Sequence, residues 1–201
     1  LLTLGATVAM AGCSQPGREP REDTAEDTSP ELTARDTPSD PPADGTTTNQ
    51  GSVEWAFDAG GLVLSSPAVS GGTVYAGSYD TNIYALDADD GSRTWQAETG
   101  DQVSSSPAVV EDTVYVGSAD GHVYALSASD GSQQWQFQTG DRVDSSPAVV
   151  DGTVYVGSAD NTVYALAAAD GSEQWQFQTG DHVDSSPTVV DDTVYVGSDD
   201  R

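Results

Sequence analysis

The 201-residue chain carries 33 acidic residues against six basic ones, all of them arginine, and its formal net charge is −27. Nucleic-acid binding needs a basic face that neutralises phosphates, so this composition excludes a nucleic-acid partner. An acidic, lysine-free surface repels itself in the folded state, and high salt screens that repulsion. We therefore interpret the composition as halophilic, with an acidic secreted protein from an ordinary environment as the alternative.

Residues 1–12 are apolar or small and uncharged, and Cys13 follows Ala11 and Gly12. About a dozen such residues are too few to span a bilayer, which takes roughly 20. No basic region precedes them, so we expect the sequence to begin inside an export signal. Small residues before a cysteine resemble a lipobox, whose cysteine becomes the lipidated first residue of the mature protein. Residues 1–13 are thus predicted to be a truncated lipoprotein-like signal with Cys13 as the lipidation site; a plain secretory signal with an incidental cysteine is the alternative.

Residues 14–52 consist mainly of Pro, Thr, Asp, Glu and Gly, with almost no large apolar side chain. Such a segment cannot bury enough surface to offset its ordering entropy, so it is predicted to be a disordered acidic tether. A flexible coil of about 38 residues reaches roughly 35 Å on average. An anchor followed by such a spacer is the expected layout for holding a domain away from a membrane surface. Cys13 is also the only cysteine, which excludes an internal disulfide within this sequence.

From residue 53 onward, short alternating runs are separated by Gly, Asp and Ser, a pattern typical of strands and turns. In one stretch the predicted strands are 143–150, 153–158, 162–167 and 173–179. The turns between them hold residues suited to tight hairpins, and they are too short for a crossover helix. The strands are therefore expected to pair in antiparallel fashion.

The same pattern returns every 40 residues, as Trp55, Trp95, Trp135 and Trp175 show. Residues 101–140 and 141–180 are identical at 31 of 40 positions. Because one such unit cannot bury both faces alone, neighbours must stack. The prediction for residues 53–201 is an all-β fold, a β-propeller of four-stranded antiparallel blades. Three full blades and partial blades at both ends provide 15 strands.

The repeated motif carries a family resemblance. Ala125, Asp130, Gly131 and Trp135, with the flanking stretches 105–109 and 114–118, resemble the pyrroloquinoline quinone (PQQ)-type propeller repeat. In that family the tryptophan docks between neighbouring blades, where its ring needs a small partner surface and its indole N–H an acceptor. The docking residues implied by the resemblance are Ala85, Gly91, Trp95, Ala125, Gly131, Trp135, Ala165, Gly171 and Trp175. Family propellers have seven or eight blades, so the sequence is expected to be a fragment; four-bladed closure through the strand around Trp55 is the alternative.

The resemblance also implies an enzyme hypothesis, because many proteins with this repeat are dehydrogenases that hold PQQ and calcium in the axial funnel. Those enzymes combine an acidic metal ligand, an Asp base and commonly an adjacent cysteine pair. This chain has only Cys13, and near-identical repeats offer the same groups again and again instead of different ones. We therefore predict no catalytic, cofactor-binding or metal-binding residue. A PQQ-dependent dehydrogenase whose catalytic blades lie outside this sequence is the alternative.

Several other residues have side chains that could form a site. Asp87 and Asp89 superficially resemble a calcium loop, but the spacing is wrong and solvated turn residues are expected. His122 and His182 have no partner at metal-ligand spacing and are predicted to be exposed turn residues. The Ser pairs before Pro67, Pro107, Pro147 and Pro187 lack a recurring base, so they are expected to bond the backbone near a strand edge rather than act as nucleophiles.

The hypothesis for function is a non-enzymatic, lipid-anchored β-propeller outside the cell, which acts as a rigid protein-binding scaffold. Its layout resembles that of the propeller lipoproteins of bacterial outer-membrane assembly. Other cell-surface proteins are the expected partners, the lipid on Cys13 provides the membrane contact, and the propeller is expected to be monomeric. Gln102, Arg142 and His182 differ between the repeats at one turn position, where partner contacts are expected.

Overall fold

The computed structural model describes residues 10–11 and 52–200. The predicted lipidation site Cys13 and the predicted tether, apart from Ser52, lie outside the described residues. Met10–Ala11 form the two-residue strand β1, which pairs in parallel with β2 (Ala56–Phe57). Within the described ranges, no helix has the length and apolar character needed to cross a membrane.

Three four-stranded antiparallel sheets form the body of the structure, and each sheet follows chain order. Their strands are β3 (Ala68–Ser70), β4 (Thr73–Gly77), β5 (Asn82–Asp87) and β6 (Arg93–Glu98); β7 (Ala108–Val110), β8 (Thr113–Gly117), β9 (His122–Ser127) and β10 (Gln133–Gln138); β11 (Ala148–Val150), β12 (Thr153–Ser158), β13 (Thr162–Ala167) and β14 (Glu173–Gln178). A final hairpin consists of β15 (Thr188–Val190) and β16 (Thr193–Tyr195). The strands β2 to β16 are the 15 predicted from residue 53 onward, and the predicted all-β fold of antiparallel blades is confirmed.

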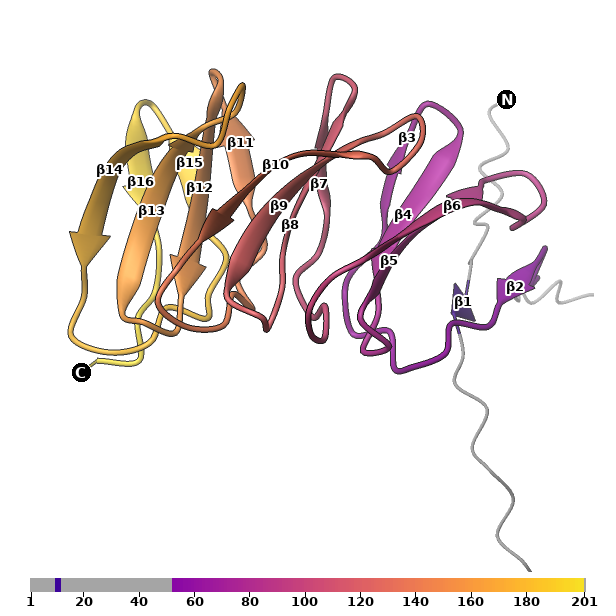
Figure 1. Ribbon diagram of the computed structural model, residues 1–201, viewed down its shortest axis with the longest axis horizontal. Coiled ribbons are helices and arrows are strands. Elements are labelled where there is room, and N and C mark those ends of the chain that lie inside the picture. Colours follow the sequence, from indigo (N-terminus) through magenta and orange to yellow (C-terminus); the bar gives the residue numbers. More distant parts are fainter. Residues whose placement is uncertain (1–9, 12–51, 201) are drawn as a thin grey trace, which may run out of the picture.

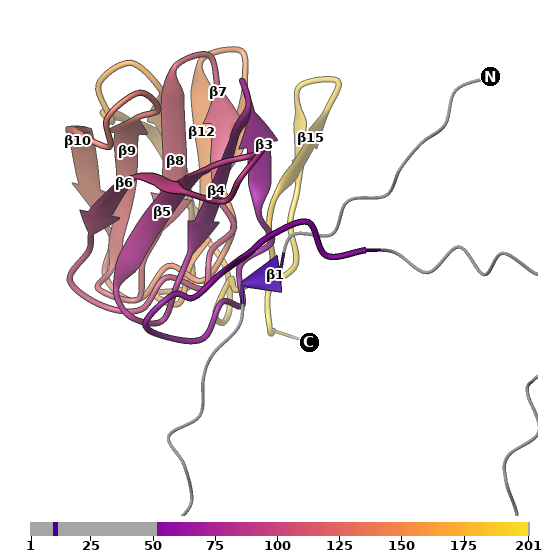
Figure 2. The same ribbon diagram turned by 90° about the vertical axis from the view of Figure 1, so that its right-hand side faces the viewer.

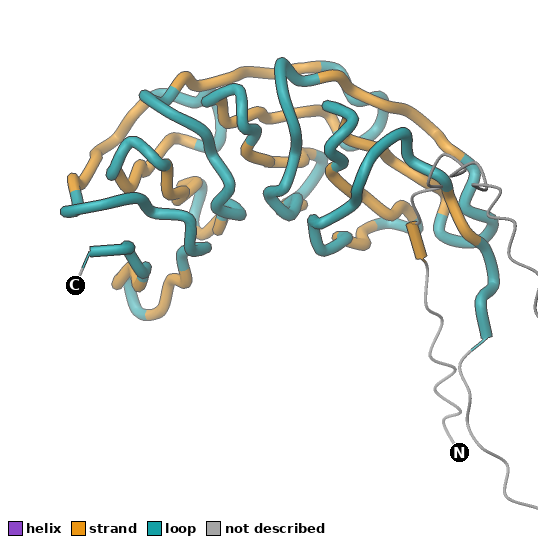
Figure 3. Tube along the Cα trace, turned by 90° about the horizontal axis from the view of Figure 1, so that it is seen from below, coloured by secondary structure: helices purple, strands orange, loops and turns teal. Residues whose placement is uncertain are grey.

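The sheets stand side by side as successive blades (Figure 1). Their first strands, β3, β7, β11 and β15, contact one another in sequence and form the inner side of the arrangement. The blades follow an arc when viewed from below (Figure 3), and turning the molecule shows one blade stacked behind the next (Figure 2). Stacked antiparallel blades along an arc are the geometry of a propeller segment.

The first strand of each blade is shorter than predicted. The strand expected over residues 143–150 begins only at Ala148, because the preceding residues bond to the neighbouring blade instead of to a ladder partner. Val143 N–H donates to Ser118 O at 3.0 Å, and Pro147 has no N–H to donate. The fourth strand of this blade ends at Gln178 rather than at residue 179, and the Thr179 hydroxyl donates to Asn161 O and Asp181 O in the turn that follows.

The core lies between the blades. Ile83, Ala85 and Trp95 of the first blade pack with Val114 and Val116 of the second. The same set of contacts recurs between the second and third blades. Each blade therefore buries one face against its successor, which is why a single 40-residue unit is not stable alone.

Candidate functional site

The repeated tryptophans lie in the seams between blades. The Trp95 ring is 8% exposed and its Nε1–H donates to Ala128 O of the next blade at 2.9 Å. Trp135 is 7% exposed and donates to Ala168 O at the same distance. Each indole thus has the acceptor that a buried N–H requires, and the acceptor comes from the following blade.

A glycine of the following blade lies against each of these rings. A Cβ on Gly131 would lie 2.6 Å from Cε3 of Trp95, and one on Gly171 would lie 2.6 Å from Cε3 of Trp135. Both glycines also have positive φ, 72° and 73°. Only glycine satisfies the turn and the close approach together.

The alanine of each motif does not receive the ring from a neighbouring blade, as the glycine does. Ala85, Ala125 and Ala165 are fully buried and stand directly opposite Trp95, Trp135 and Trp175 in the ladder of their own blade. The small surface that receives the ring is therefore the glycine turn one blade further on, while the alanine leaves room beside the ring within its own sheet.

Two tryptophans depart from the predicted docking set. Trp55 was not included, yet it contacts Gly91 and donates to Ala88 O at 2.9 Å, so it fills the first seam. Its exact 40-residue spacing from Trp95 was the signal for this role. Trp175 is 40% exposed, and with Val163, Phe177, Val194 and Val196 it lines an open apolar hollow of about 170 Å³.

A second joint connects consecutive blades through an aspartate. Asp120 Oδ2 accepts hydrogen bonds from Tyr124 OH at 2.6 Å and from Gly100 N–H at 2.6 Å. Burial opposes ionisation of Asp120, but the hydrogen bonds from Tyr124, Gly100 and His122 outweigh it and lower the pKa of its carboxyl. Burial and the bond to the carboxylate together raise the pKa of the Tyr124 phenol.

The same joint recurs in the neighbouring blades. Tyr84 OH donates to Asp80 Oδ2 at 2.5 Å, and Tyr164 OH donates to Asp160 Oδ2 at 2.7 Å. Burial, followed by the bond to Asp80, raises the pKa of Tyr84 to about 12. A strongly perturbed pKa in every blade indicates a structural element of the repeat rather than one catalytic group.

The serine pairs bond the backbone between blades. Ser66 N–H donates to Ser106 Oγ at 2.8 Å, and Ser106 N–H donates to Ser146 Oγ at 2.8 Å. Ser105 Oγ accepts from Gly117 N–H at 3.0 Å and donates to Ser145 O at 3.0 Å. These hydroxyls form a hydrogen-bonded row along the inner strands, and none of these bonds activates an oxygen as a nucleophile.

One end of the blades carries both the connections between blades and the hairpins between second and third strands. We call it the connection end, and it comprises residues 78–81, 99–106, 118–121, 139–146, 158–161, 179–186 and 196–200. Arg142 Nε donates to Asp144 Oδ2 at 2.6 Å and its Nη2 donates to Asp184 Oδ2 at 3.3 Å. Ser104 Oγ also donates to Asp144. Polar side chains that differ between repeats are therefore linked across three blades here.

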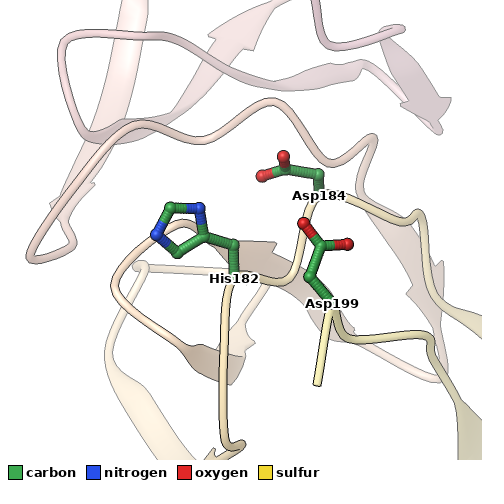
Figure 4. A group of neighbouring side chains, drawn as sticks. All are labelled: His182, Asp184 and Asp199. Carbon is green, nitrogen blue, oxygen red and sulfur yellow. The ribbon is translucent and has the colours of Figure 1, made fainter. Parts of the chain in front are cut away.

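His182, Asp184 and Asp199 gather at this end (Figure 4). Their ligand-type atoms all lie within 4.8 Å of one another. His182 lies in the loop as predicted, but it is half-buried rather than exposed, and the two exposed aspartates lie beside it. Residues 182 and 199 lie on different loops, so their spacing in the sequence does not reveal the group. His122 is likewise half-buried, at the start of β9, with Nδ1 3.2 Å from Asp120 Oδ1.

Comparison with protein families decides the membership of the chain. The sequence model described as outer membrane protein assembly factor BamB, a PQQ-repeat model, matches residues 45–136 and 84–201. The chain belongs to this BamB family. A comparison with curated protein sequences found no match.

Solved structures place this BamB-family chain among propellers. BamB from Moraxella catarrhalis is 27% identical with a TM-score of 0.66, over 73% of this chain and 47% of that one. The computationally designed Ika4 protein, 18% identical with a TM-score of 0.68 over 75% and 94% of the two chains, shares the fold. The quinohemoprotein alcohol dehydrogenase ADHIIG from Pseudomonas putida HK5 is 30% identical with a TM-score of 0.56, over 63% of this chain and 22% of that one. The chain therefore spans less than half the length of these two natural proteins.

The likeness to a quinohemoprotein raises the question of whether PQQ and calcium fit the described residues. A tryptophan platform for a quinone needs a free ring face, but Gly131 and Gly171 lie against the rings of Trp95 and Trp135. Asp87 Oδ1 accepts from Asp89 N–H at 2.8 Å, which closes the turn. The seam tryptophans Trp95 and Trp135 and the turn at Asp87 and Asp89 therefore do not fit PQQ or its calcium ion.

Proposed function

We propose that this chain belongs to a non-enzymatic, extracytoplasmic and lipid-anchored β-propeller that serves as a protein-binding scaffold. One observation carries the proposal: the repeated polar and aromatic groups are engaged in joints between blades. The indoles, the Asp–Tyr pairs and the serine hydroxyls each bond the neighbouring blade or its connection. Such joints give rigidity, and rigidity is what a scaffold offers a partner.

The connection end is the proposed partner surface. Gln102, Arg142 and His182 occupy the same position in successive blades and differ there, whereas the joints are repeated nearly unchanged. Beside Arg142, a shallow hollow of about 150 Å³ is lined by Asp120, Thr139 and Asp141 among others. A polar surface whose residues vary from blade to blade can be specific for one partner, because each blade contributes a different contact.

Membership of the BamB family supports the proposed scaffold role. The family model that matches this chain is described as outer membrane protein assembly factor BamB, and this chain covers 47% of BamB from Moraxella catarrhalis. The proposed membrane contact is the lipid on Cys13, and other cell-surface proteins are the proposed partners. A monomeric propeller is the form that we propose for the scaffold.

Photo-crosslinking in the native cell tests the partner surface. A photoreactive residue replaces Gln102 or Arg142 at the connection end, and in matched controls it replaces Glu111 or Asp151 in turns at the opposite end of the blades. We expect one exported protein to be crosslinked from positions 102 and 142 and not from positions 111 and 151. Equal crosslinking from all four positions, or none from positions 102 and 142, contradicts the proposal.

The lipid anchor and the absence of catalysis need separate measurements. Metabolic labelling with an alkyne fatty acid should mark the wild-type protein and not Cys13→Ser, and equal labelling of both contradicts the anchor. Addition of PQQ and calcium to the full-length protein should produce no dye-linked alcohol oxidation. Tight PQQ binding with turnover would establish the dehydrogenase alternative instead.

A further inference from the structure

The group of His182, Asp184 and Asp199 is specific to one place in the chain. In the two preceding repeats, the residues equivalent to His182 are Gln102 and Arg142. Those equivalent to Asp199 are Ala119 and Ala159. Residues 181–200 differ from residues 141–160 at only four positions, and two of these four supply His182 and Asp199. Both replace side chains that cannot ligate a metal in the preceding blade, and both lie next to the carboxylate of Asp184 (Figure 4).

The distances suit a single small cation. Zn²⁺ holds imidazole nitrogen and carboxylate oxygen at about 2.0–2.2 Å, so two ligand atoms on one ion lie up to about 4.4 Å apart. The three ligand atoms here already lie within 4.8 Å of one another. A small movement of the partly exposed side chains would bring the three atoms within the reach of one ion, and water would occupy the remaining coordination positions.

Surrounding hydrogen bonds hold the ligands in place. Asp199 N–H donates to His182 O at 3.0 Å, which ties the segment after β16 to the loop between β14 and β15. Arg142 Nη2 donates to Asp184 Oδ2 and leaves the other oxygen for a metal. Asp181 Oδ1 lies 3.9 Å from His182 Nε2, a contact longer than a hydrogen bond. Hydrogen-bonded outer partners orient metal ligands in known sites.

We propose that His182, Asp184 and Asp199 bind one divalent transition-metal ion, such as Zn²⁺. An imidazole with two carboxylates suits Zn²⁺ and its first-row neighbours, whereas Mg²⁺ and Ca²⁺ prefer sites made of oxygen ligands alone. The ion would crosslink the loop before β15 to the segment after β16. This site shares His182 with the proposed partner surface, but metal binding does not depend on the scaffold function, and it adds a metal to a chain for which the sequence predicts none.

Isothermal titration of the full chain with ZnCl₂ tests the proposal, in chelator-treated buffer with molar KCl to screen diffuse cation binding. The variants His182→Gln and Asp199→Ala install residues that the same fold already carries at positions 102 and 119, so folding should be retained. His122→Asn is the matched control, since it removes the other histidine and installs the residue at position 82. Co²⁺ absorption provides a second, coordination-specific readout.

We expect one equivalent of Zn²⁺ to bind the wild type and His122→Asn alike. Affinity should fall at least tenfold in both His182→Gln and Asp199→Ala, with loss of the Co²⁺ bands. A hundredfold excess of Mg²⁺ or Ca²⁺ should not displace the ion. Cys13 is present in every sample, so binding through its thiol would appear equally in all of them. Failure of the wild type to bind Zn²⁺, or an affinity and Co²⁺ spectrum in either variant equal to those of the wild type, overturns the three-residue site.

Discussion

The seam tryptophans allow a direct measurement of what one blade contributes to the next. Trp135→Ala removes a ring that is 7% exposed, together with its hydrogen bond to Ala168 O. A tryptophan buries about 150–250 Å², which at about 25 cal/mol/Å² corresponds to about 4–6 kcal/mol of transfer free energy. Substitutions of this type destabilise proteins by about 3–5 kcal/mol. We expect a loss in that range from the free energy of unfolding.

Trp175→Ala is the matched control in the same 201-residue chain. Trp175 has the equivalent ladder partner, Ala165, and a similar contact with Tyr155 at 5.9 Å between ring centroids, against 5.8 Å for Trp135 and Tyr115. Its ring is 40% exposed, so it gains less from burial. The expected loss is about 2–3 kcal/mol, because Trp175 buries roughly 65% of the fraction that Trp135 buries.

Urea unfolding in molar KCl, followed by far-UV circular dichroism, measures both variants without relying on tryptophan emission. The informative quantity is the difference between the two losses, because the contacts within the blade cancel. A loss below about 0.5 kcal/mol for Trp135→Ala, or equal losses for both variants, would refute the seam as a major source of stability.

Three further outcomes are expected. In urea titrations, Gly171→Ala should destabilise the chain by about 1 kcal/mol or more beyond the effect of Gly152→Ala. Both glycines have positive φ, but only Gly171 lies against an indole ring. Equal effects of the two substitutions would contradict the steric argument. Burial opposes ionisation of Asp80 and Asp120, but their hydrogen bonds outweigh it and lower the carboxyl pKa below the ordinary 3.8. The stability that these carboxylates contribute is therefore present above that pH and is lost as the pH falls through the lowered pKa. The urea concentration at the unfolding midpoint should therefore fall once the pH is lowered below about 4. It should fall less in Asp120→Asn than in the wild type. The melting temperature should rise between low and molar salt because screening relieves self-repulsion, and a constant midpoint would contradict the halophilic interpretation.

The repeat, the strand order and the family were accessible from the sequence because they depend on local chemistry. Alternating apolar residues and short Gly-containing or Asp-containing turns specify hairpins wherever they occur, and a 40-residue period requires that blades stack. The first strands are shorter than the sequence predicts, since an alternating pattern at residues 143–147 does not reveal that the Val143 and Ser146 N–H groups and the Ser146 hydroxyl bond other blades.

The sequence by itself determined that this chain builds near-identical four-stranded blades with one tryptophan each, because period, turn chemistry and apolar alternation are properties of the chain alone. Only the tertiary structure decided which residues of different blades meet. The ring of Trp135 lies against Gly171, 36 positions away, while its own motif provides the cross-strand Ala125. His182 and Asp199 come together for the same reason: the connection and the hairpin of a blade end on one side, and only the path of the folded backbone sets their distance.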